Sequence, residues 1–188
     1  MKNKFTIAII LIASMIAGCD PHKDGSTKSE NELITRVSLS FISTDSSNKD
    51  SLYVFWDDPD GIGGNNPRLP DTIHFKTNKQ YVCFAEFGEE HHGIFQDITN
   101  TIKSEGVNHL LCFDVNSMTM PPNAGITITR ADKDNNGLEI GLETMWKMNR
   151  TDIGSVKVRL KHQPGIKNGT CDPGETDVEV DFPFVITN

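Results

Sequence analysis

The sequence lacks the short motifs that mark the common hydrolase classes. It contains neither the HExxH pattern of zinc peptidases nor the Gly-x-Ser-x-Gly turn of serine hydrolases. It also has no CxxC pair, the usual sign of a structural zinc site, and no two carboxylates whose context marks them as acid and base. We therefore expect a binding protein and not an enzyme, since catalysis would have to use an unrecognised arrangement of residues.

Basic side chains are scarce as well. The 188 residues carry 18 Lys and Arg against 26 Asp and Glu, which gives a formal net charge of −8. Nucleic acids and anionic lipid surfaces bind clustered Lys and Arg, so this balance argues against both as partners. An acidic body is compatible with the binding of cations.

No hydrophobic run reaches the length of about 20 residues that a permanent membrane-spanning helix needs. A shorter apolar run, Phe5–Ala17, follows Lys2 and Lys4 and ends at Ile16–Cys19, where an aliphatic and two small residues precede a cysteine. This order is typical of a bacterial lipoprotein signal peptide. We expect cleavage before Cys19 and its acylation, with palmitate as a typical chain; the alternative is a secreted protein whose Cys19 is incidental.

Cleavage would remove two lysines and no acidic residue, so the formal net charge would fall from −8 to −10. The boundaries that follow are a signal peptide at 1–18, a polar flexible tether at 19–32 and a single domain at 33–188. The expected location is the bacterial cell envelope, with a lipid anchor in the membrane. We favour the outer over the inner membrane, although Asp20 after the cysteine retains lipoproteins in the inner membrane of some bacteria.

The rest of the chain alternates apolar and polar residues with the period of a β-strand, as in Leu33–Phe41. One short helix is expected after Asp97, with Ile98 and Ile102 on one face and Gly106 at its end. Many short strands and one helix predict an antiparallel immunoglobulin-like β-sandwich; a small open barrel is the alternative. The other expected strands are 51–56, 72–76, 80–87, 109–115, 125–130, 154–161 and 176–186. The aromatic residues expected in the core are Phe55, Trp56, Phe75, Phe84, Phe87, Phe113 and Trp146.

Three cysteines follow Cys19, so at least one of them stays unpaired within a monomer. Cys83 and Cys112 lie in strand-like apolar runs, and Cys171 lies in a loop of Gly, Pro and Asn. The two strand cysteines are interpreted as small buried hydrophobic residues, or alternatively as a Cys83–Cys112 disulfide, with zinc or catalytic chemistry as the remaining possibility.

The segment Asp132–Glu143 satisfies the calcium-loop pattern D-x-[DN]-x-[DN]-G-x5-E. Asp132, Asp134, Asn136 and a bidentate Glu143 would be the ligands of calcium or another divalent metal. The same residues also make a good tight turn without an ion, and the preceding segment is a strand and not the helix of an EF-hand. A plain turn, a calcium site between strands and an EF-hand therefore remain as three interpretations.

A second candidate metal site is the run Glu89, Glu90, His91 and His92. These side chains could hold a transition metal together with His74, His109 or His162, or they could form a solvated loop between a strand and the helix. The acidic segment 57–67 contains turn residues and lacks the glutamate that would complete an ion loop.

Several segments together resemble a family of small Bacteroidetes envelope lipoproteins, often encoded near TonB-dependent outer-membrane receptors. The resemblance covers residues 33–188 and implies an all-β lipoprotein that acts beside an uptake receptor, with a metal or metal chelate as cargo. The sequence departs from the family at Glu143 and at the run 89–92. The segments that carry the resemblance are Asp58–Asn65, Gln96–Ile102, Asp132–Leu142, Arg159–Pro164 and Gly174–Val180.

The sequence therefore predicts a lipid-anchored binding module of the cell envelope, accessory to an outer-membrane receptor. The alternative is a structural or adhesion domain, with or without stabilising calcium. Under the binding-module hypothesis, the contacts are expected on the long loops 57–71 and 87–96, which the sandwich holds in place.

Overall fold

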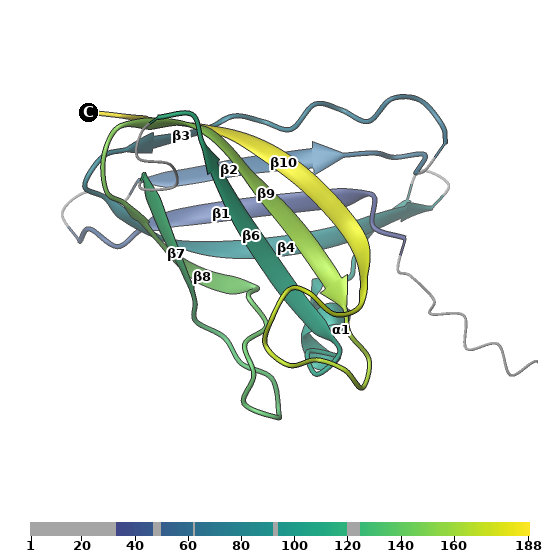
Figure 1. Cartoon of the computed structure of the whole chain (residues 1–188). Coiled ribbons are helices and arrows are strands. Elements are labelled where there is room, and N and C mark those ends of the chain that lie inside the picture. Colours follow the sequence, from purple (N-terminus) through teal and green to yellow (C-terminus); the bar gives the residue numbers. More distant parts are fainter. Residues whose placement is uncertain (1–32, 47–49, 62, 92–93, 120–124) are drawn as a thin grey trace, which may run out of the picture. The chain divides into compact units, whose positions relative to one another are not determined.

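The alternating segments form two β-sheets that pack against each other (Figure 1). The computed structural model describes residues 33–46, 50–61, 63–91, 94–119 and 125–188. The first sheet has the order β2-β1-β4-β8-β7, with β5 paired to β4, and the second has the order β3-β10-β9-β6. The elements are β1 (Arg36–Ser43), β2 (Ser51–Asp57), β3 (Ile73–Lys76), β4 (Gln80–His91), β5 (Ile94–Asp97), α1 (Thr99–Ser104), β6 (His109–Ser117), β7 (Ile126–Arg130), β8 (Glu143–Met148), β9 (Asp152–His162) and β10 (Glu175–Thr187).

The fold is mainly β, with one short helix in the described residues, and the predicted β-sandwich is confirmed. Strands β6, β9 and β10 cross over β1 and β4 in Figure 1, so the two layers enclose the core. Pairing between neighbouring strands is antiparallel, except that β3 runs parallel to β10. The helix α1 lies where predicted, with Ile102 buried.

The core joins the two sheets through aromatic side chains. Phe41 from β1 is completely buried, and its ring lies edge-to-face against Trp146 from β8 and Phe75 from β3, with ring centroids 5.1 Å apart in each pair. Because Phe75 belongs to the second sheet, these contacts hold the two layers together. Burial of each such side chain contributes about 1.5–3 kcal/mol.

Two of the expected core residues and two of the strands differ from the prediction. Phe84 lies on the outer face of the first sheet and is 38% exposed, and Phe55 is only half-buried. Strands β5 and β8 were not predicted: β5 has four exposed residues, and β8 follows the segment interpreted as an ion loop, with Glu143 as the one residue that the two share. The described part of the chain contains no helix long and apolar enough to cross a membrane.

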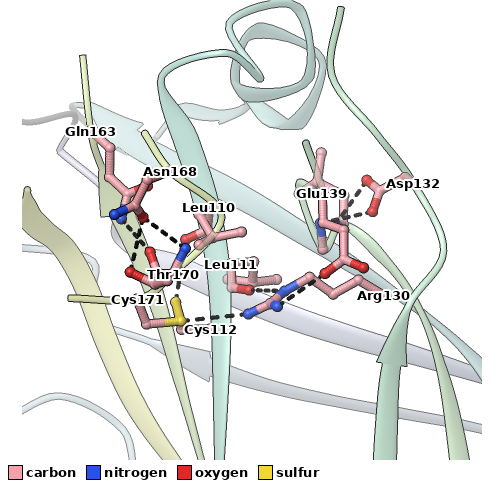
Figure 2. Close-up of polar contacts among 12 residues, drawn as sticks. Leu110, Leu111, Cys112, Arg130, Asp132, Glu139, Gln163, Asn168, Thr170 and Cys171 are labelled. Carbon is pink, nitrogen blue, oxygen red and sulfur yellow. Dashed lines mark hydrogen bonds and ion pairs between the residues drawn. A yellow bond between two sulfur atoms is a disulfide. The ribbon is translucent and has the colours of Figure 1, made fainter. Parts of the chain in front are cut away.

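The disulfide joins Cys112 to Cys171, so the Cys83–Cys112 pairing is wrong. Cys112 points from β6 away from the core, toward the loop that connects β9 to β10, whereas Cys83 faces the core and is a buried free thiol. Burial raises the pKa of Cys83, so this thiol is unreactive. Figure 2 shows the guanidinium of Arg130 beside the bridge, donating to Cys171 Sγ at 3.5 Å and to the Leu111 carbonyl oxygen at 2.8 Å.

We predict that removal of this disulfide in the Cys112→Ser/Cys171→Ser double variant lowers the free energy of unfolding by about 2–4 kcal/mol, because the unfolded chain gains loop entropy. Urea denaturation at neutral pH measures the change. Reductant should lower the stability of the wild type and leave the stability of the variant unchanged. Equal stability of wild type and variant without reductant would contradict the prediction.

Candidate functional site

Two histidines and an aspartate from three neighbouring strands meet at one end of the second sheet. His109 begins β6, His162 ends β9 and Asp177 lies near the start of β10. One ligand atom from each side chain lies within 4.8 Å of the other two. The imidazole rings of His109 and His162 are stacked, with centroids 4.9 Å apart, and His109 Nε2 lies 3.9 Å from Asp177 Oδ2.

Strand register and one irregularity bring these residues together. His109 and His162 are directly opposite in the antiparallel pair of β6 and β9, so their side chains leave the sheet on the same face. In β10 the register shifts between Thr176 and Val178, which makes Asp177 the extra residue of a β-bulge. Such bulges redirect a side chain and are common next to functional sites.

The hydrogen bond at Nδ1 of His109 determines which ring nitrogen carries the proton. Nδ1 lies 3.2 Å from the carbonyl oxygen of Glu105 and must donate the hydrogen bond, because a carbonyl oxygen only accepts. Burial, together with the charge of His162, lowers the pKa of His109, so the ring is neutral. Nε2 therefore has a free lone pair, and it has no hydrogen-bond partner among the described residues.

The carboxylate of Asp177 also lacks hydrogen-bond partners among the described residues. Its side chain is completely buried, and neither oxygen has a hydrogen-bond partner in the described part of the chain. Burial raises the pKa of Asp177 to about 6, so the group is still ionised at neutral pH. A buried ion without hydrogen bonds is costly, and here it faces the lone pair of His109 Nε2.

A divalent cation would satisfy both groups at once. Imidazole nitrogens and a carboxylate oxygen are ligands that zinc and other first-row transition metals accept, and a His109 ring fixed through Nδ1 to a carbonyl is the usual arrangement behind a metal ligand. The cluster of His109, His162 and Asp177 could therefore hold a metal.

The loop between β9 and β10 fixes this end of the sheet. The side chain of Gln163 is completely buried, and its amide donates to the carbonyl oxygens of Thr170 and Pro173, each at 2.9 Å. Gly174 has a positive φ of 80°, and a Cβ there would lie 2.1 Å from the carbonyl oxygen of His162. Only glycine permits this close approach, which leads the chain back into β10 next to His162.

The residues of the predicted calcium loop are brought together in part. Asp132 accepts backbone hydrogen bonds from Gly141 and Leu142 at 2.7 and 3.0 Å, and Asp134 accepts from the backbone of Asn136 at 2.8 Å. Glu143 is exposed at the start of β8, where its carbonyl oxygen accepts from the backbone of Ala131.

The second carboxylate oxygen of Asp134 accepts from Lys167 Nζ at 2.8 Å, and both side chains are nearly completely buried. Burial opposes the ionisation of Asp134, but the hydrogen bonds from Lys167, Leu138 and Asn136 together lower its pKa. The positive charge that a calcium ion would bring is thus supplied by an ammonium group. This geometry favours the turn among the three interpretations of the segment.

The second predicted site forms part of a hairpin instead of a loop. Strand β4 continues through Glu89 and Glu90 to His91 and pairs with β5, and His92 and the side chain of His91 lie outside the described residues. Successive residues of a strand point to opposite faces, so Glu89 and Glu90 do not converge on one ion. His74 is exposed on β3, which β10 separates from β9.

Sequence reasoning considered His109 and His162 only as additional ligands for that run and did not consider Asp177. The three residues are far apart in the sequence and form no motif. The available signal was positional, since His109 begins one expected strand and His162 directly follows another.

Cys19 lies outside the described residues. The chain matches no protein-family model, no curated protein and no solved structure.

We predict that Asp177→Asn stabilises the metal-free protein at neutral pH by about 1–3 kcal/mol, the cost of a buried polar group without a partner. The asparagine amide can donate to His109 Nε2, and no charge is buried. Because the folded state raises the pKa of Asp177 from 3.8 to about 6, the wild type binds this proton more tightly when folded. The stability contributed by protonated Asp177 is therefore complete below pH 3.8 and is lost as the pH rises through about 6.

Thermal unfolding in chelator at a series of pH values tests this prediction. The melting temperatures of wild type and Asp177→Asn should converge in acid and separate toward neutral pH. Asp181→Asn is the matched control, because Asp181 lies on the same strand but is exposed. A variant that is less stable than the wild type at neutral pH would contradict the prediction.

Proposed function

We propose that this protein is a lipid-anchored module of the bacterial cell envelope that binds a divalent transition metal at His109, His162 and Asp177. The observation that supports the proposal most is the pairing of a buried ionised carboxylate with a buried imidazole lone pair, neither of which has a hydrogen-bond partner among the described residues. Such a pair lowers the stability of the empty protein, and a bound cation would remove the cost.

The donor set favours zinc or a related metal over calcium. Calcium takes six to eight oxygen ligands, whereas two imidazoles and one carboxylate suit zinc, copper, nickel or iron. The acidic composition of the chain is compatible with a cationic ligand. No group in the cluster is placed as a nucleophile next to a base, so we favour binding over catalysis.

The proposed location rests on residues 1–19, where the basic start, the short apolar run and the small residues before Cys19 form a lipoprotein signal peptide. Two or more acyl chains give a stable anchor, and confinement to a membrane raises the effective concentration of a partner in the same membrane. The resemblance to lipoproteins encoded near TonB-dependent receptors supports the outer membrane as the location and a receptor as the partner.

We predict that the metal-free protein binds one zinc ion per chain. Asp177→Asn and His109→Ala should each weaken zinc binding by more than about tenfold, because loss of even a residue that only hydrogen-bonds to a metal ligand has an effect of that size. Isothermal titration calorimetry with Zn²⁺ measures the affinities. His74→Ala is the matched control, because this exposed histidine lies at the far edge of the same sheet. Equal affinity of wild type and Asp177→Asn would overturn the proposal, since this variant is expected to fold at least as well.

We predict that Cys19→Ala abolishes acylation and leaves the signal peptide attached. Metabolic labelling with an alkyne-bearing palmitate measures acylation, detergent phase separation measures the anchoring of the wild type, and the intact mass of the protein shows whether residues 1–18 are still attached. The wild type should be labelled and enter the detergent phase, and the Cys83→Ala control should behave in the same way because Cys83 is a buried core residue. Equal labelling of wild type and Cys19→Ala would contradict the anchor.

A further inference from the structure

An exposed glutamate stands next to the metal cluster on the same three strands. Glu175, the first residue of β10, is directly opposite His162, which in turn is directly opposite His109. Opposite residues of an antiparallel pair have Cβ atoms about 4.5–5.5 Å apart and lie on one face. The three side chains therefore form a row across the sheet, and Asp177 is two residues further along the strand.

The carboxylate of Glu175 is not used elsewhere. The residue is exposed, and its carboxylate takes part in no hydrogen bond or ion pair in the described ranges of the chain. Its negative charge acts on Asp177 and contributes to the raised pKa of that group. Other exposed carboxylates of β10 are engaged, since Glu179 and Asp181 both pair with Lys157.

Three protein ligands leave a tetrahedral metal ion with one open position. We propose, on the basis of the proposed function, that Glu175 supplies the fourth ligand by rotation of its side chain over the stacked imidazoles. Two carboxylates then neutralise the charge of a divalent ion, and four protein ligands fill its coordination shell. Closed four-ligand sites hold a metal ion, whereas catalytic sites keep a position open.

The position of Glu175 also indicates what the site takes up. The side chains of His109 and Asp177 are buried and Glu175 is exposed, so an ion reaches the two buried ligands past Glu175. A metal that ends with four protein ligands has no position left for a chelator. The cargo is therefore the free aquated divalent ion and not a metal chelate.

Cobalt(II) is the probe, because its visible d–d absorption reports coordination number. Metal-free wild type should bind Co²⁺ with the intense absorption of a tetrahedral complex, and added azide should leave the spectrum unchanged. Glu175→Ala should bind Co²⁺ about tenfold or more weakly, and its spectrum should change with azide, which enters the vacated position. Glu175→Gln, which keeps the size of the side chain, should show the same loss of affinity.

Glu179→Ala is the matched control on the same strand and should retain the affinity and the azide-insensitive spectrum of the wild type. If wild type and Glu175→Ala have equal affinity and both spectra change with azide, Glu175 is not a ligand and this inference is overturned, while metal binding stands. If wild type binds no Co²⁺ at all, the proposed function itself fails.

Discussion

The antiparallel register of β6, β9 and β10 is the constraint on which the candidate site depends. Because side chains alternate between the two faces of a strand, a slip of one residue would turn His109 or His162 to the other face. The bulge at Asp177 adds one residue to β10 and aims its carboxylate at His109. The cluster is therefore a property of the sheet, and no single segment of the chain contains it.

The burial of the Asp177 carboxylate costs free energy. Covalent and polar links around the loop between β9 and β10 stabilise this end of the sheet against that cost. The disulfide ties Cys171 to β6, the buried amide of Gln163 holds two carbonyl groups of the loop, and Lys167 reaches both Asp134 and the Gly106 carbonyl oxygen at the end of α1. A buried carboxylate without hydrogen bonds can persist only where its surroundings are fixed in this way. The same links also keep the ligands in place for a metal ion, so stability and proposed function are linked through Asp177.

Local pattern was enough to predict most of the fold, because a period of two depends only on neighbouring residues. It failed for β8, a short strand that starts at Glu143, where the match to the calcium-loop pattern ends, and contains the core residue Trp146. It failed for the disulfide and for the cluster of His109, His162 and Asp177 for another reason, since both depend on which strands become neighbours. Only the sheet order places Cys112 under the loop of Cys171 and His109 beside His162.

The calcium-loop interpretation made from the sequence differs from the structural cluster in one physical respect. In the segment Asp132–Glu143 the two aspartates are satisfied by backbone N–H groups and by Lys167, so an ion would have to displace existing bonds. In the cluster the oxygens of Asp177 and Nε2 of His109 have no such bonds among the described residues, so at these atoms an ion adds interactions without displacing a hydrogen bond. A high local density of acidic residues is therefore a weaker indication of a cation site than buried ligand atoms that lack hydrogen-bond partners. By this criterion, the end of the second sheet is a better candidate for a functional site than the acidic loops.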